Sequence, residues 1–144
     1  MDLTQPEQIK EAWTAESRMV WLETPTNPML SVFDIRAISD VVHELGGVVV
    51  VDNTFATPYL QQPLDLGADV VVHSATKYIG GHSDVVGGFV ATNNESLAED
   101  LVYIQNAVGA ILARLTVIWR CVELKRSPFA WTATVKMPNK LLLC

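Results

Sequence analysis

The sequence lacks any long apolar run and any secretory signal. No stretch approaches the roughly 20 apolar residues that a membrane-spanning helix needs. The N-terminus, MDLTQPEQIKEAW, has no basic start followed by an apolar segment. Basic residues are also scarce, and the net charge of −6 disfavours nucleic acid or a membrane surface as a partner. We therefore expect a cytoplasmic protein without either partner.

Signatures of several cofactors and mechanisms are missing too. The chain has no glycine-rich dinucleotide fingerprint, no Walker loop and no serine in a nucleophile elbow. Its three histidines, His43, His73 and His82, show no ligand spacing such as i, i+4, and no cysteine cluster accompanies them. The sequence therefore disfavours a metal site.

The charge of the chain changes sign near residue 113. With 144 residues, 49% of them hydrophobic, the chain is long enough for one domain with a core. Residues 1–113 hold four lysines and arginines against fifteen acidic residues. Residues 114–144 hold six against one, together with both cysteines, Cys121 and Cys144. The break separates the main part of the chain from a basic tail.

Residues 34–46 have the pattern of an amphipathic helix. Asp34 can cap its N-terminus, and Gly46-Gly47 ends it. Its apolar residues fall on one face at helical spacing, and they are Ile35, Ile38, Val42 and Leu45.

Apolar runs on both sides of this helix predict strands at residues 19–23, 48–52 and 70–73. Strand, helix and strand in this order imply a right-handed crossover and a parallel sheet. We therefore predict an α/β fold with a mainly parallel sheet and flanking helices.

Local signals predict the remaining elements. Thr4–Glu7 fits a capping box that opens a short helix, and residues 55–66 form a proline-punctuated connection with a short helical segment. Residues 85–91 predict another strand, and Ser96 is expected to cap a helix that runs to about residue 107.

Reactive side chains follow two of the predicted strands. One strand ends in Asp52, and the next leads into Ser74-Ala75-Thr76-Lys77. Because open parallel sheets place ligands at the carboxyl ends of their strands, we expect Asp52 and Lys77 to face one site. Pyridoxal phosphate needs an amine for its aldehyde and a carboxylate for its ring nitrogen. The hydroxyls of Ser74 and Thr76 could bind its phosphate.

A loop stiffened by two prolines, Thr24–Pro28, follows the first strand. In this loop Asn27 could direct its amide at a ring oxygen, or it could serve only the turn. The alternatives for the other two residues are similar: Lys77 could be a solvated surface lysine, and Asp52 a residue of a strand-end turn.

Four motifs, in this order and spacing, resemble the trans-sulfuration enzymes. They are ETPTNP (residues 23–28), VDNT (51–54), SATKY (74–78) and GHSDVV (81–86). The trans-sulfuration enzymes are the Cys/Met-metabolism group of fold-type I pyridoxal-phosphate enzymes, and they include cystathionine γ-lyase and γ-synthase. The similarity runs from about residue 18 to residue 113.

The resemblance implies a part of the aspartate-aminotransferase-like large domain, with pyridoxal 5'-phosphate as cofactor. Lys77 resembles the Schiff-base lysine, which also moves protons during the reaction. Asp52 resembles the partner of the pyridine nitrogen, Asn27 the contact to the ring hydroxyl, and Ser74 and Thr76 the phosphate ligands. The substrate would be a small amino acid, and a full-length member would be a homotetramer with sites shared between subunits.

The implied reaction is γ-elimination by a cystathionine γ-lyase, which gives cysteine, 2-oxobutanoate and ammonia. One alternative is cystathionine γ-synthase, which replaces the γ-substituent of an activated homoserine. Another is a non-catalytic fragment that binds the cofactor weakly at most. Residues 1–113 resemble only the central part of the cofactor-binding domain, without the phosphate loop, the ring-stacking tyrosine and the second domain of the family. We therefore expect the isolated chain to turn over poorly or not at all.

The tail departs from the family after residue 113. The family continues with a proline–aromatic segment and a leucine-rich helix, whereas this chain reads ARLTVIWRCVELKRSPFAW. One permitted set of codons for residues 113–121, read from the third base, encodes Pro-Phe-Asp-Cys-Tyr-Leu-Ala-Leu, which is similar to the family continuation. We therefore predict that residues 114–144 are a frameshifted tail without selected function, in which both cysteines are incidental free thiols. A divergent basic tail is the alternative.

Overall fold

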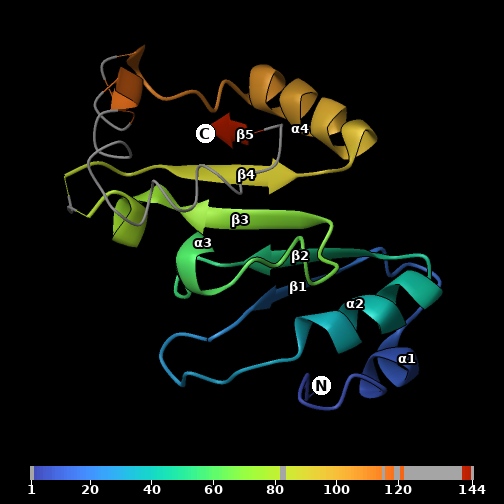
Figure 1. Cartoon of the computed structure of the whole chain (residues 1–144). Helices are drawn as coiled ribbons and strands as arrows, with labels where there is room; N and C mark the ends of the chain where they lie inside the picture. The colour runs from blue at the N-terminus through green and yellow to red at the C-terminus, as the bar shows by residue number, and fades with distance from the viewer. Residues whose placement is uncertain (1, 82–83, 115, 119–120, 122–140, 144) are drawn as a thin grey trace.

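A five-stranded sheet organises the chain, in the order β1-β2-β3-β4-β5 (Figure 1). The computed structural model describes residues 2–81, 84–114, 116–118, 121 and 141–143. Three strands pair in parallel: β1 (Met19–Glu23), β2 (Val48–Asp52) and β3 (Val70–Ser74). β4 (Gly88–Thr92) is antiparallel to β3, and β5 (Leu141–Leu143) is antiparallel to β4. Four of these strands therefore run in one direction, and the predicted mainly parallel α/β fold is confirmed.

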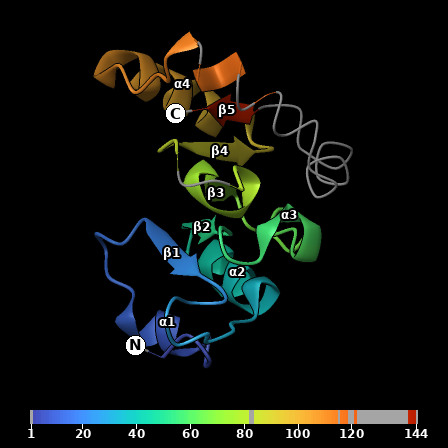
Figure 2. The same cartoon turned by 90° about the vertical axis from the view of Figure 1, so that its left-hand side faces the viewer.

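Helices flank the sheet near its first strands and near β4. α1 (Gln8–Ala12) and α2 (Ile35–Glu44) pack at the β1–β2 end, whereas α4 (Glu95–Val108) lies at the β4 end (Figures 1 and 2). The short helix α3 (Thr57–Leu60) falls inside the predicted connection after β2. Among the described residues, no helix has the length and the apolar character that a membrane crossing requires.

α2 forms as its sequence predicts. The Asp34 side chain accepts a hydrogen bond from the N–H of Ala37 at 3.0 Å, which satisfies one of the free amides of the first turn. Gly46 has a φ of +73°, a backbone conformation that glycine adopts without strain, and it ends the helix. The apolar face is buried, with Leu45 partly buried at its end; its buried members are Ile35, Ile38 and Val42.

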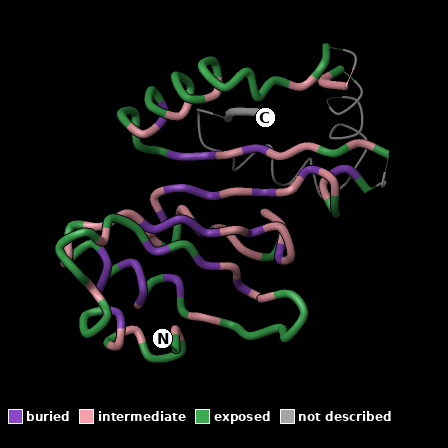
Figure 3. The backbone as a smooth tube through the Cα atoms, turned by 180° about the vertical axis from the view of Figure 1, so that it is seen from behind, coloured by how far each residue is buried: buried purple, intermediate pink, exposed green. Residues whose placement is uncertain are grey.

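The core lies between α1, α2 and one face of the sheet. Alternate residues of β1 and β2 turn toward the helices, namely Val20, Leu22, Val49 and Val51. Buried residues follow the central strands in the tube drawing, in purple (Figure 3). The intervening residues of β1, Met19 and Trp21, are 55% and 57% exposed, because they point to the other face.

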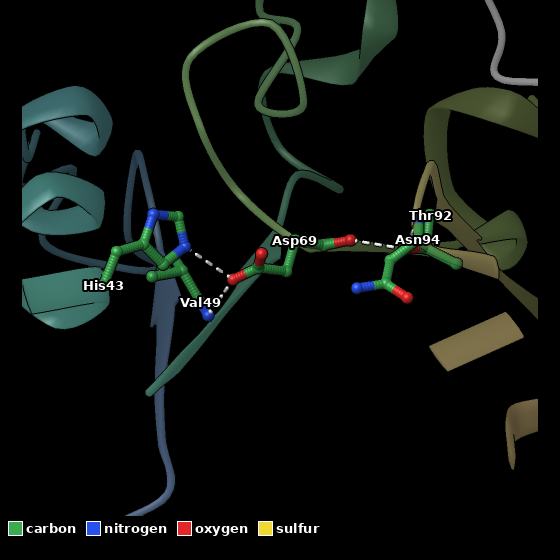
Figure 4. A network of polar contacts seen from close by, with 5 residues as sticks. All are labelled: His43, Val49, Asp69, Thr92 and Asn94. Carbon is green, nitrogen blue, oxygen red and sulfur yellow. Dashed lines mark hydrogen bonds and ion pairs between the residues drawn. The ribbon is translucent and has the colours of Figure 1, made fainter. Parts of the chain in front are cut away.

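A polar network fastens the chain where β3 begins. One carboxylate oxygen of Asp69 accepts the N–H of Val49 at 2.7 Å and pairs with Nε2 of His43 at 2.9 Å (Figure 4). The carbonyl of Asp69 accepts the hydroxyl of Thr92 at 2.6 Å, and the N–H of Asn94 donates to that hydroxyl at 3.1 Å. The network therefore joins α2, β2, β3 and the β4–α4 connection.

Two predicted helix starts are wrong, because a neighbouring side chain competes. The Thr4 hydroxyl donates to Asp2 at 2.7 Å and does not cap α1, which has no side-chain cap. Asn94 caps α4 by accepting the N–H three residues later at 3.1 Å. Ser96, the predicted cap, therefore lies inside the first turn.

The last strand of the main part begins later than predicted, at Gly88 and not at Val85. The carbonyl of Gly87 accepts the N–H of Ala75 at 2.8 Å, and its N–H donates to the Thr76 hydroxyl at 3.1 Å. These bonds tie Gly87 to the turn after β3 and leave it outside the strand.

Most of the predicted tail, residues 114–144, lies outside the described residues. β5 belongs to this tail and pairs with β4. Cys121 is an exposed free thiol, whereas Cys144 is not among the described residues. The boundary near residue 113 and the frameshift stay predictions.

Candidate cofactor site

The carboxyl ends of β1, β2 and β3 meet at one edge of the sheet. In the strand register Glu23 lies beside Asp52, and Asp52 lies beside Val72. Because side chains alternate along a strand, Ser74 shares the face of Val72. β3 then passes directly into a tight turn, Ala75–Ile79, which carries Thr76 and is kinked at Lys77. The topology therefore delivers two acids, hydroxyls and an amine to one place.

A pocket of about 540 Å³ lies at this edge, within the range of small-molecule sites. The structure brings all five predicted site residues to its lining: Asn27, Asp52, Ser74, Thr76 and Lys77. The roles of these residues stay predictions. Five further residues complete the lining, and they are Glu23, Thr54, Phe55, Tyr78 and Gly81.

Asp52 is held by the residues that follow it. The N–H of Thr54 donates to Oδ1 of Asp52 at 3.0 Å, which fixes the carboxylate at the end of β2. The Thr54 hydroxyl accepts the N–H of Ser74 at 2.8 Å, which ties the end of β2 to the end of β3. Thr54 therefore sets the spacing between the acid and the turn that carries the lysine.

Three of the predicted site residues keep their polar groups free for a ligand. The side chains of Asn27, Ser74 and Lys77 make no hydrogen bond or ion pair with other residues that the structure describes. Lys77 is also exposed, and the backbone leaves helical geometry at this residue (φ −94°, ψ −128°). Its amine is therefore accessible to an electrophile.

Thr76 differs from these residues because its hydroxyl has partners. The hydroxyl donates to the carbonyl of Gly87 at 3.3 Å and accepts the N–H of the same residue at 3.1 Å. To donate to a phosphate oxygen, the hydroxyl must turn away from the Gly87 carbonyl.

Asn27 is placed by a loop that contains cis peptide bonds at Thr24-Pro25 and Asn27-Pro28. The backbone N–H of Asn27 donates to the Glu23 carboxylate at 3.3 Å. Glu23 therefore connects this loop to the end of β1, next to Asp52.

His73 lies behind the site, on the opposite face of β3 from Ser74. His73 is 2% exposed and stacks on Phe89, with ring centroids 4.7 Å apart, and its Nδ1 has no hydrogen-bond partner among the described residues. Burial lowers the pKa of His73 from 6.5 to about 4, although the charge of Asp52 acts in the opposite direction. The histidine is therefore neutral near pH 7.

The polar groups of the pocket fit pyridoxal phosphate in their chemistry. Lys77 offers an amine for the aldehyde, and Asp52 a carboxylate for the ring nitrogen. The Asn27 amide can donate to the ring oxygen, and Ser74 and Thr76 can donate to phosphate oxygens.

Sequence reasoning assigned no role to the four side chains that complete the lining together with Gly81. Glu23, Thr54 and Tyr78 lie within the quoted motifs, and the period of a strand would have placed Thr54 on the side of Asp52. Phe55 contacts Tyr78 edge to face, with ring centroids 6.1 Å apart and planes at 78°. No local signal predicts this aromatic pair, because its rings come from segments that follow different strands, β2 and β3.

Curated relatives of the chain are trans-sulfuration enzymes. A cystathionine β-lyase from Lactococcus lactis subsp. cremoris is 54% identical over 112 residues, which are 78% of this chain and 30% of that protein. A cystathionine γ-synthase from Mycobacterium tuberculosis is 57% identical over 103 residues, which are 72% of this chain and 26% of that protein. The chain thus spans less than a third of the length of these relatives.

The fold is that of solved enzymes of the same kind. The structure of cystathionine γ-lyase from Lactobacillus plantarum, complexed with L-serine, superposes with a TM-score of 0.82 at 44% identity. The superposition covers 85% of this chain and 32% of that one. The profile of one protein family, described as "Cys/Met metabolism PLP-dependent enzyme", matches residues 1–121. The chain therefore belongs to the family of Cys/Met metabolism enzymes that depend on pyridoxal phosphate.

Proposed function

We propose that residues 1–113 are the central, cofactor-holding part of a trans-sulfuration enzyme of the cystathionine γ-lyase type. The reaction would eliminate the γ-substituent of cystathionine and give cysteine, 2-oxobutanoate and ammonia. One observation carries the proposal: Lys77 and Asp52 line the same pocket, together with an amide and two hydroxyls.

Each polar residue has a separate task in this proposal. Lys77 would hold the cofactor through its Nζ and, as a free amine, would move protons between carbon atoms of the substrate. Asp52 holds the proton on the ring nitrogen, and Asn27 donates to the ring oxygen. Ser74 and Thr76 donate to the phosphate. When bound, pyridoxal phosphate supplies an electron-accepting ring.

The surroundings of Lys77 leave its amine accessible, as both of its tasks require. Lys77 is exposed in the pocket and has no ion pair with another described residue. Lys10, by contrast, pairs with Glu44 at 2.9 Å and with Glu7 at 3.4 Å, which stabilises its charged form.

Cystathionine γ-synthase activity is the second candidate. The γ-synthase of M. tuberculosis is about as similar to this chain as the β-lyase of L. lactis, at 57% and 54% identity. The amine and the acid of the pocket serve all of these reactions, so the substrate groups around the reacting carbon must decide between them. Product analysis with cystathionine, and with an activated homoserine plus cysteine, separates the candidates.

The proposal predicts low turnover by the 144-residue chain alone. In the described pocket only two hydroxyls are assigned to the phosphate, and the matched segment makes up less than a third of each relative. Assembly into a homotetramer, as in full-length members, would bring residues of neighbouring subunits to the site. We therefore expect measurable cofactor binding with slow or no release of ammonia.

Titration with pyridoxal phosphate tests the attachment site. The 144-residue chain should develop the visible absorption of bound cofactor, and Lys77→Ala should lose it. Lys10→Ala is the matched control and should keep it, because Lys10 lies outside the pocket. Unchanged absorption in Lys77→Ala would contradict the proposal.

A further inference from the structure

A part-buried amide network, centred on Gln61, includes Asn53, the residue between the pocket-lining Asp52 and Thr54. Nε2 of Gln61 donates to the carbonyl of Thr24 at 2.8 Å and to Oδ1 of Asn53 at 2.9 Å. Nδ2 of Asn53 donates back to the carbonyl of Gln61 at 2.9 Å. Thr24 and Asn53 are fully buried, so water cannot readily replace these donors.

The two acceptors belong to different walls of the pocket. Thr24 begins the loop that carries Asn27, and its hydroxyl also accepts the N–H of Phe33 at 2.9 Å, which closes the far end of the loop. Asn53 lies directly after Asp52 in the chain. Gln61 itself does not line the pocket. Its amide therefore bridges the Asn27 loop and the Asp52 strand end from outside the site.

We propose that Gln61 is a positioning residue, which holds the loop of Asn27 at a fixed distance from Asp52. This inference rests on the proposed contacts of Asn27 and Asp52 with the two sides of one pyridine ring. A rigid ring requires its two partners at a set separation, and a loop free to move would lose this preorganisation. Without the Gln61 donor, the buried Thr24 carbonyl and Asn53 oxygen would favour conformations in which water reaches them.

Amide hydrogen exchange on the whole 144-residue chain, without cofactor, tests the bridge itself. In the Gln61→Leu variant the backbone amides of Thr26 and Leu30 should exchange about tenfold faster. This is the effect expected from the loss of two hydrogen bonds to buried oxygens. Both amides bond within the loop, to Ser31 and Thr26 respectively. Amides of β2 should keep their protection. Equal exchange of the loop in Gln61→Leu and in the unchanged chain would overturn the proposal.

Two further variants keep this test decisive. Gln62→Leu makes the same change one residue later, where the side chain has no hydrogen bond to a described residue, and should leave the loop unchanged. If Gln61→Leu does not fold, Gln61→Met replaces it, because methionine keeps the length of the side chain, stays uncharged and has no donor. Faster exchange throughout the chain, and not in the loop alone, would count against a positioning role.

Cofactor binding tests whether Gln61 acts through Asn27. Gln61→Met should weaken pyridoxal phosphate binding about tenfold in the unchanged chain, but much less in the Asn27→Ala background. An equal loss in both backgrounds would overturn the route through Asn27. Failure of every variant to bind the cofactor would instead remove the proposed function, while the exchange experiment still decides whether Gln61 holds the loop.

Discussion

Acid should weaken the fold through His73. In the folded chain this imidazole is buried against Phe89 and has a pKa of about 4, whereas an unfolded histidine titrates near 6.5. Between these pH values the unfolded chain binds a proton that the folded chain does not, so the free energy of unfolding falls as the pH falls. The difference between the two pKa values corresponds to about 3 kcal/mol at pH 4 and about 2 kcal/mol at pH 5.

Urea unfolding at pH 7.5 and at pH 5 measures this contribution, with tryptophan fluorescence as the signal. His73→Phe keeps an aromatic ring on Phe89 and removes the titrating group. All other titrating groups affect both proteins alike. Between pH 7.5 and pH 5 the free energy of unfolding should therefore fall by about 2 kcal/mol less in the variant than in the unchanged chain. His43→Gln is the control, because His43 is partly exposed and the variant retains His73. An equal loss of stability in His73→Phe and the unchanged chain would refute the reasoning.

Two further substitutions test the packing and the polar network by urea unfolding. Gly47→Ala would press a methyl group into the Trp13 ring and should lower the free energy of unfolding by about 1–3 kcal/mol. The same substitution should cost less in a Trp13→Leu background, and a Gly47→Ala chain of unchanged stability would count against this packing. Asp69→Ala removes the acceptor of the Val49 amide and should cost about 1–3 kcal/mol. Asp69→Asn should lower the free energy of unfolding less, because the amide oxygen can still accept the Val49 N–H. Asp40 is exposed, and an Asp40→Ala variant that loses as much stability as Asp69→Ala would contradict a specific role for the network.

Much of the fold could be predicted because its signals are local. The valine runs of β2 and β3 and the apolar face of α2 follow from the periods of strand and helix. Parallel pairing then places Asp52 and the turn with Lys77 at one edge of the sheet, which needs no knowledge of side-chain contacts. The candidate site residues therefore lie together for topological reasons.

The supporting contacts could not be predicted, because they join residues far apart in the chain. Gln61 bonds to Thr24, 37 residues earlier, and the Thr76 hydroxyl bonds to Gly87, 11 residues later. Local preference for a cap also failed at Ser96, where the amide of Asn94 was the stronger competitor. These contacts depend on the tertiary arrangement, and they set how rigid the pocket is.

Borohydride reduction in the presence of pyridoxal phosphate, followed by peptide mass mapping, tests the central claim most directly. We predict that the reduced cofactor is found on the peptide that contains Lys77, and that Asp52→Asn lowers its yield. The Lys10 peptide should remain unlabelled, because its amine is held in ion pairs. A chain that carries the label at Lys10 to the same extent, or carries none at Lys77, would contradict the account.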